Sequence, residues 1–324
     1  TKISLDKTTF KVDNNDIVYL KSNMKPLNGY LTCEYGIMGL YKDGKKEGVH
    51  KNWYSKGTLM SEEEIINGAN VKISKKWYTD GSLKELIDRD LRTFKKWYNS
   101  GELYIKANYF KEKLNGQYIS FFKNGNKKSS GLYLNGKKDG EWKEWYENKQ
   151  MKAKIHFQKG LLFGESIYWF NNGKLEIKGN YINGDGSRLG GSGISQNGRE
   201  GNWNSYHKNG KLEWEQNFKS GYTDGKHKYF NEDGVIEAIE TFDFKKSLSE
   251  GEDVLNGYAK YFYIVGDNTS ETIEGKYVNG IREGKWTKYQ GNWKWIITYK
   301  NGRELNEAEF YNYRTNGPAV WTRR

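Results

Sequence analysis

A short pattern recurs about ten times along this chain of 324 residues, at a spacing close to 24 residues. In its clearest copy, Gly140 opens a run that carries aromatic residues at Trp142 and Trp145. Four successive copies place an aromatic residue five positions after the opening residue, at intervals of 24: Trp97, Phe121, Trp145 and Trp169. Such a repeat constrains the fold first, because each copy is one supersecondary unit and the stack of copies forms the architecture.

Each copy carries the signals of one antiparallel β-hairpin. Asn-Gly or Asp-Gly ends the first strand in most copies, as at Gly173 and Gly210, and supplies the positive φ angles that tight turns need. Apolar residues then alternate, which indicates a strand with one buried face. The sequence therefore predicts an all-β fold: an elongated, single-layer antiparallel sheet of about ten consecutive hairpins, twisted into a ribbon.

The repeat also suggests how the chain is divided. Residues 1–28 lie outside it and are expected to cap the array, residues 29–302 form the array, and residues 303–324 form a last repeat or a second cap. Two insertions, at about 182–200 and 243–256, lengthen the connections between copies. Insertions on a rigid scaffold often carry binding residues, although tolerated length variation is the commoner explanation.

The charge favours acidic partners, but it does not require them. The chain carries a net charge of +12, which suits anionic lipid, envelope polymer, nucleic acid or an acidic protein. The lysines are spread through every repeat, so they equally fit solvated strand positions. Compartment stays open: the chain begins at Thr1, which is consistent with an exported or envelope-associated protein that lost a leader, or with a cytoplasmic one.

Residues that could carry chemistry are scarce. Cys33 is the single cysteine, so neither a disulfide within the chain nor a cysteine-based zinc site is expected. His50 and His227 stand two positions after an opening glycine, where other copies have Trp, and are interpreted as fillers of the strand surface. The glycine run 190–193 lacks the Lys-Ser/Thr of a phosphate loop and is interpreted as a flexible loop. We therefore predict no catalytic residue, no metal and no cofactor.

The pattern Gly-x-Trp-x-x-Trp/Tyr-Tyr-x-Asn-Gly-x-Leu, followed by a strand ending Tyr-x-Asn-Gly-Lys-x-x-Gly, resembles the MORN repeat. It is most similar to the bacterial MORN-variant form of YwqK-family antitoxins; residues 164–184 and 201–225 match closely, and the likeness covers about residues 29–302. Copies near Trp77, Trp97 and Lys149 lack the expected glycines. The resemblance implies a binding or scaffolding array without catalytic residues, and bacterial members are often named as antitoxin or immunity components of toxin modules.

The first functional hypothesis is a non-enzymatic protein-recognition module of a bacterial toxin system, resembling an antitoxin or immunity protein. Its candidate contact residues are Trp145, Trp169, Trp203, Trp214, Trp286, Arg188 and Arg199. The alternative is a cell-envelope or membrane-surface scaffold that binds anionic lipid or polymer through distributed Lys and aromatic residues. Nucleic acid is not the expected partner, and the oligomeric state stays open. The aromatic rows are equally explained as cross-strand pairs that hold a thin sheet together.

Overall fold

A computed structural model of the protein describes residues 2–4, 10–68, 70–265, 269–305, 309–312 and 317–318. The chain divides into two compact units, residues 1–139 and 140–324. Each unit is described by itself. Part of the expected C-terminal segment 303–324 lies outside the described residues, and the division into cap, array and C-terminal segment stays a prediction.

The first unit consists of β-strands that pair with their neighbours in the chain. The strands are β1(Lys2–Ser4), β2(Phe10–Val12), β3(Val18–Leu20), β4(Gly29–Cys33), β5(Gly36–Lys42), β6(Lys45–Trp53), β7(Leu59–Gly68), β8(Asn70–Trp77), β9(Leu83–Asp88), β10(Thr93–Trp97), β11(Leu103–Phe110), β12(Lys113–Phe121) and β13(Lys127–Leu134). Antiparallel pairing runs without a crossover from β4 to β13. Strand β1 adds to β4 in parallel, and β2 and β3 form a separate two-stranded sheet.

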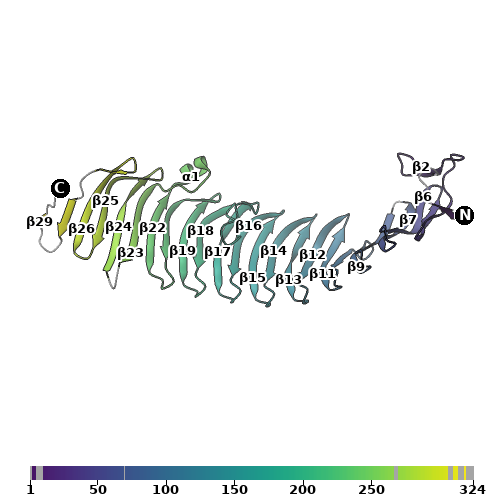
Figure 1. Ribbon diagram of the computed structural model, residues 1–324, viewed down its shortest axis with the longest axis horizontal. Helices are drawn as coiled ribbons and strands as arrows, with labels where there is room; N and C mark the ends of the chain where they lie inside the picture. The colour runs from purple at the N-terminus through teal and green to yellow at the C-terminus, as the bar shows by residue number, and fades with distance from the viewer. Residues whose placement is uncertain are drawn as a thin grey trace. The chain divides into compact units, whose positions relative to one another are not determined.

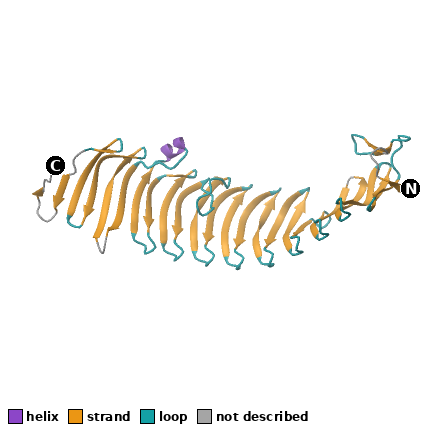
Figure 2. Ribbon diagram, viewed as in Figure 1, coloured by secondary structure: helices purple, strands orange, loops and turns teal. Residues whose placement is uncertain are grey.

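The second unit continues the same plan. Its elements are β14(Lys137–Trp145), β15(Met151–Gln158), β16(Leu161–Trp169), β17(Leu175–Gly184), β18(Arg199–Tyr206), β19(Leu212–Lys219), β20(Tyr222–Thr223), β21(Gly225–Phe230), β22(Ile236–Phe242), α1(Phe244–Glu250), β23(Gly257–Val265), β24(Thr269–Val278), β25(Ile281–Gln290), β26(Trp293–Lys300), β27(Arg303–Glu304), β28(Glu309–Asn312) and β29(Gly317–Pro318). Strands β15 to β26 lie side by side in one row (Figure 1). The prediction of an all-β fold of consecutive antiparallel hairpins is confirmed (Figure 2).

The acidic insertion at 243–256 holds the short helix α1, which the sequence analysis did not predict. Asp243 caps its start by accepting a hydrogen bond from the backbone N–H of Lys246, and Gly251 ends it in the left-handed conformation. Figure 2 shows this helix beside the strand ends. Asp253, which follows the helix, accepts a hydrogen bond from the Thr223 N–H at 3.0 Å. The insertion is thereby fastened to the hairpin that precedes it.

Aromatic rings that lie flat on glycines form the interior of the hairpins. The Trp203 side chain is 0% exposed, and a Cβ atom added to Gly179 on the preceding strand would come within 2.1 Å of its indole ring. Trp286 covers Gly275 in the same way. Tyr181 meets the Trp203 ring edge-on, with 4.8 Å between the ring centroids. Each glycine therefore provides the space that a ring fills.

The two histidines interpreted as surface fillers occupy this buried position instead. His50 is 5% exposed and His227 is 0% exposed, so the interpretation was wrong. His50 lies over Gly39, where an added Cβ would meet its ring at 2.2 Å. His227 packs against Phe242, with 4.5 Å between the ring centroids. The reason is positional: the residue two places after the opening glycine points into the hairpin interior, and a planar ring fits there.

A β-bulge follows the buried position in each regular hairpin. In the pairing of β14 with β15, Glu144 is opposite Ala153 and Trp145 is opposite Met151, so Lys152 has no partner residue. The same shift occurs beside Trp169 in β16–β17, beside Tyr206 in β18–β19 and beside Phe230 in β21–β22. A bulge bends its strand and increases the local twist without ending the sheet.

Hydrogen bonds between turns hold successive hairpins in register. The Tyr146 hydroxyl donates to the carbonyl oxygen of Trp169 at 2.7 Å, 23 residues along the chain. Tyr54 donates to Trp77 and Tyr98 donates to Phe121 over the same separation. The turn tyrosine of one copy therefore ties down the aromatic position of the next.

Replacing Gly179 by Ala should destabilise the protein through steric conflict. The new methyl group would meet the Trp203 ring, and such overpacking costs about 1–3 kcal/mol. Gly191→Ala is the matched control, because its Cβ would meet nothing within 4 Å. Urea unfolding of both variants measures the difference. Equal unfolding midpoints for Gly179→Ala and the wild type would show that the ring does not depend on the glycine.

Tyr146→Phe should lower the free energy of unfolding by about 1 kcal/mol, the usual net contribution of one hydrogen bond. The ring stays in place, so only the bond to the Trp169 carbonyl is lost. Tyr222→Phe serves as the control, since its hydroxyl has no hydrogen bond among the residues that the structure describes. Urea unfolding that is insensitive to Tyr146→Phe would contradict a register role for the bond.

Candidate functional site

A groove of about 690 Å³ opens on one face of the second unit. It is lined by residues of β17, β18, β19 and β21, by the turns after β16 and β18, and by the insertion before β18. Four aromatic side chains line it: Phe170, Tyr206, Trp214 and Tyr229. Trp214 also packs against the hydrophobic cluster that contains Trp203 and Phe218. The groove therefore lies directly over the unit's core.

The insertion at 182–200 is folded into a wall of this groove. The Ser195 hydroxyl donates to the Ser187 carbonyl oxygen at 2.7 Å, and the Tyr181 hydroxyl donates to the Ser195 carbonyl oxygen at 2.5 Å. Gly190 and Gly193 close a turn through a backbone hydrogen bond of 2.8 Å. The glycine run, which the sequence suggested to be a flexible loop, thus contributes residues Gly190 and Gly191 to the groove lining.

Arg199 lies at the end of the insertion and is covered by its surroundings. Its side chain is 3% exposed, and its guanidinium carbon lies 4.4 Å from the ring centroid of Trp203 and 5.2 Å from that of Phe218. Its Nε donates to the Ser195 carbonyl oxygen at 3.1 Å. Burial lowers the pKa of Arg199, but a guanidinium still remains charged. Arg199 therefore joins the insertion to the core through cation–π contacts.

The structure brings two of the seven predicted contact residues to the groove, Trp214 and Arg199. Trp203 and Trp286 are 0% and 1% exposed, so in this structure they support packing and are not open to a partner. The same holds for Arg199, which lines the groove but is covered. A binding role for any of the seven stays a prediction.

The other three predicted residues lie elsewhere on the unit. Trp145 and Trp169 are half-buried at the ends of β14 and β16, outside the groove. Arg188 stacks over the Tyr222 ring at 4.3 Å, and its Nη1 donates to the Gly221 carbonyl oxygen. It therefore fastens the insertion to the neighbouring turn.

Two carboxylates of the groove occupy bulge positions, and the sequence analysis missed both. Glu176 falls between Leu175, which is opposite Trp169, and Ile177, which is opposite Tyr168. Glu213 holds the same place in the next hairpin. Because one strand separates them, the two positions lie about 10 Å apart. An alignment of the repeats could have found these two residues, because the equivalent residue one copy earlier is Lys152, so the sign of the charge changes at this position.

The two carboxylates differ in their surroundings. Glu213 accepts a hydrogen bond from the Ser205 hydroxyl at 2.5 Å. The Glu176 carboxylate has no hydrogen bond or ion pair among the residues that the structure describes. Burial is the main cause that raises the pKa of Glu176; the charge of Glu213 adds to it, while Lys152 and Lys208 oppose it. The groove thus holds a half-buried carboxylate that Lys152 and Lys208 influence through their charge, but that forms no direct ion pair among the described residues.

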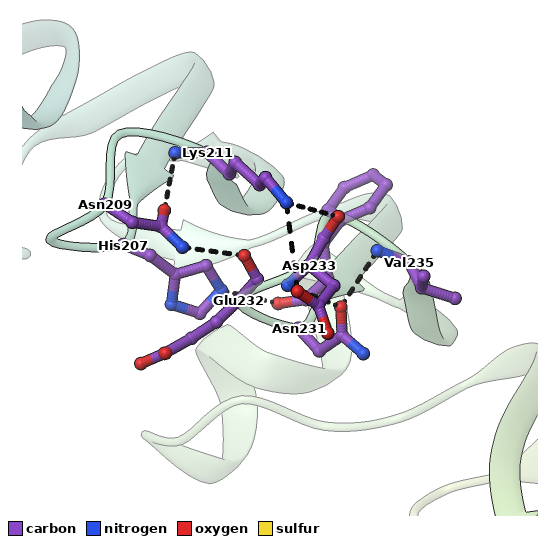
Figure 3. Close-up of polar contacts among 8 residues, drawn as sticks. His207, Asn209, Lys211, Asn231, Glu232, Asp233 and Val235 are labelled. Carbon is purple, nitrogen blue, oxygen red and sulfur yellow. Dashed lines mark hydrogen bonds and ion pairs between the residues drawn. The ribbon is translucent and has the colours of Figure 1, made fainter.

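The turn that follows β18 contributes His207 and Lys208 to the groove lining. Figure 3 shows the hydrogen bonds that hold this turn. His207 donates from Nε2 to the Phe230 carbonyl oxygen at 2.8 Å, and Asn209 donates to the Glu232 carbonyl oxygen at 2.7 Å. Lys211 donates to the Asp233 carbonyl oxygen at 2.8 Å. These bonds fix the turn after β18 to the turn after β21. His207 and Glu232, which line the groove, are therefore held in position by backbone contacts.

The opposite face of the same strands is polar and carries ion pairs. Asn202, Asn204, Glu215 and Lys228 line a shallow depression of about 280 Å³ there. Lys228 lies 3.0 Å from the Glu215 carboxylate. Similar pairs join Lys154 to Glu141 and Lys260 to Glu274. Some of the lysines on these strands are therefore paired locally, whereas Lys226 forms no ion pair among the described residues.

Within the described ranges, no group of three or more His, Cys, Asp or Glu side chains is placed to hold a metal ion. No helix in that part of the chain is both long and apolar enough to span a bilayer.

Comparisons with known proteins bear on the repeats. Four segments match the MORN repeat variant family: residues 138–159, 164–183, 199–220 and 223–243. No curated protein matches the sequence. A chain in a solved structure described as "Crystal Structure of TcdB2-TccC3-Cdc42" aligns at 9% identity over 82% of this chain and 17% of that chain, with a TM-score of 0.18. At that score the likeness carries no argument. The MORN-type repeat predicted from the sequence is thus confirmed for four copies, all in the part of the chain that contains the groove.

Glu176→Gln should stabilise the protein at neutral pH. The raised pKa means that the folded state holds the proton more tightly than the unfolded chain, so ionised Glu176 opposes folding. The advantage of the variant should be complete above the folded pKa and should fade as the pH falls toward 4.5, the ordinary glutamate value. Urea unfolding between pH 4 and pH 8 measures it. A variant that is less stable at neutral pH would show that Glu176 is satisfied in the native state.

Proposed function

We propose that this protein is a non-catalytic binding protein that recognises another protein through the groove. MORN-variant repeats provide the scaffold, and the matched segments include the strands that line the groove. The observation that carries the proposal is the insertion at 182–200, which lies between the second and third matched segments and is built into a groove wall. An ordered insertion beside exposed ring surface is typical of a recognition site on a rigid scaffold.

The side chains of the groove suit a protein partner. Trp and Tyr are enriched among the residues that dominate binding energy at protein interfaces, and Trp214, Tyr206 and Tyr229 lie together here. They surround polar groups such as Gln216 and Glu213, which can orient a partner by hydrogen bonding. The rigid turn at His207 and Asn209 limits the entropy lost when a partner docks.

The alternative, a scaffold that binds anionic lipid or polymer, receives less support from the paired lysines. Lys228, Lys154 and Lys260 each lie within 3.0 Å of a carboxylate. Paired charges attract a polyanion less than free ones, and their contribution weakens further with salt. We therefore favour protein recognition.

At a finer level, we propose an antitoxin or immunity-like role for this recognition. The likeness of the repeats to the bacterial MORN-variant form supports this assignment, and the groove suggests how it would operate. A partner segment seated against Trp214 would be covered by the insertion and the turn after β18, so a functional site on that partner would be blocked sterically and electrostatically.

Affinity capture with the full chain as bait tests the proposal. We expect one protein partner to be retained at low and at high salt, and to be lost from Trp214→Ala. Trp145→Ala is the matched control, because it removes a half-buried Trp outside the groove. Circular dichroism confirms that both baits are folded.

For the immunity role, co-expression of the captured partner should arrest growth, and the wild-type chain, but not Trp214→Ala, should relieve the arrest.

Other outcomes of the capture would overturn the proposal. Retention of lipid or polymer that is released by salt would assign the chain to the alternative. Equal loss of the partner from Trp214→Ala and Trp145→Ala would place recognition outside the groove.

A further inference from the structure

We propose that the groove binds a positively charged side chain, an arginine or lysine carried by an extended segment of the partner protein. This inference rests on the proposed function and specifies the chemistry of the partner. It follows from a comparison of the bulge residues of successive hairpins. Several hairpins have a lysine at the bulge, whereas the hairpin β16–β17, which lines the groove, has Glu176 there.

In three hairpins the bulge residue is a lysine that covers an aromatic ring of the preceding turn. Lys152 places its Nζ 5.9 Å from the centroid of the Tyr146 ring. Lys84 lies 5.3 Å from the Tyr78 ring in the same arrangement, and Lys128 lies 5.6 Å from the ring of Phe122. In each case the lysine follows the aromatic residue by six positions. The repeat therefore contains a regular intramolecular cation–π contact.

The hairpin β16–β17 keeps the aromatic residue and inverts the charge. Phe170 occupies the turn position and Glu176, six residues later, occupies the bulge. No cation lies over the Phe170 ring among the described residues. Both side chains line the groove. The ring that a lysine covers elsewhere is thus half-buried and carries no cation here, and a carboxylate stands where the lysine would be.

The surroundings of this pair favour an external cation. Lys208 lines the groove and Lys152 lies near enough to act on Glu176 through its charge, but neither forms an ion pair with Glu176 within 4.0 Å. Glu213 adds a second carboxylate at the equivalent bulge, beside Trp214. A cation between an aromatic face and a carboxylate gains both a cation–π contact and a charge-assisted hydrogen bond. The groove is therefore complementary to a guanidinium or an ammonium group.

The spacing of the two carboxylates specifies how a protein segment would present its charges. Glu176 and Glu213 lie two strands apart, which is about 10 Å. A polyproline II segment rises about 3.1 Å per residue and returns to the same side every third residue, so its side chains at i and i+3 are about 9 Å apart. Cationic residues at every third position would match both carboxylates.

A labelled peptide of sequence Arg-Pro-Pro-Arg-Pro-Pro-Arg tests the inference against the full chain by fluorescence anisotropy. We expect saturable binding that weakens about tenfold in Glu176→Gln and in Glu213→Gln, since each loses one charge-assisted hydrogen bond. Glu215→Gln is the matched control. It removes one carboxylate from β19, the strand that carries Glu213, but Glu215 faces the depression on the opposite side of the sheet. Its affinity should stay within about twofold of the wild type.

Glu176→Lys gives a stricter test, because it restores the arrangement that Lys152 and Tyr146 already show. The variant should remain as stable as the wild type, with its new lysine over Phe170, and should lose peptide binding by more than about tenfold. A peptide in which citrulline replaces each arginine keeps the shape of the side chain, but a carbonyl oxygen replaces one NH2 group, so the charge and the donors of that group are lost. It should bind the wild type at least about tenfold more weakly.

Several results would overturn the inference. Equal affinity for the arginine and citrulline peptides, absence of peptide binding, or an equal effect of Glu215→Gln would each exclude a site for a cationic segment of a partner protein. Binding of spermidine, but not of the peptide, with the same dependence on Glu176 would identify a small cation as the ligand instead. If the peptide fails while Trp214→Ala still abolishes capture of a protein partner, the cation site is wrong and the proposed function stands.

Discussion

The contact between a flat ring and a glycine of the preceding strand is the interaction on which this fold depends. A single row of strands has no second layer to bury its apolar face, so each hairpin must remove ring surface from water within the sheet itself. Trp203 reaches 0% exposure by lying on the backbone at Gly179. A side chain at that glycine would hold the ring away from the strand and expose both of its faces. The pairing of a large residue with the smallest one thus substitutes for a second sheet.

The packing of rings onto glycines makes the two faces of the second unit chemically different. Rings, small residues and the covering guanidinium of Arg199 occupy one face, whereas carboxylates and lysines alternate on the other. The same contact recurs at Trp286, where the guanidinium carbon of Arg282 lies 4.5 Å from the ring centroid. The buried rings are closed by their own packing, and the groove is where the insertion and the bulges bring several half-buried rings together, although single rings such as Trp293 are exposed elsewhere on the unit.

The sequence predicted what local signals determine. Turn dipeptides and the period of 24 were sufficient to identify the hairpins, since both act within a few residues. Sequence patterns did not predict side-chain burial where burial depends on the neighbouring strand. His50 and His227 look like polar surface residues until Gly39 or Phe242 is placed beside them.

The site was harder to predict than the fold for the same reason. The aromatic pattern suggests Trp214 and Trp203 equally as contact residues, but Trp214 lines the groove and Trp203 is buried, and Arg199 of the long insertion is buried as well. Glu176 and Glu213 were missed because a bulge moves them out of the alternation that the sequence shows. The wall formed by the insertion depends on the bond from Tyr181 to Ser195, which joins residues 14 apart.

The bulge position explains how one scaffold can present different chemistries. A residue at a bulge has no partner in the strand pairing, so its replacement leaves the hydrogen-bonded ladder and the ring–glycine packing intact. Lys128 and Lys152 fill that position in two hairpins, while Glu176 and Glu213 fill it in others, and the fold around each is the same. The repeat pattern therefore determines the architecture without determining the charge that it displays. That charge is set one hairpin at a time, so a family-level pattern carries no information about the chemistry that the bulges and insertions display.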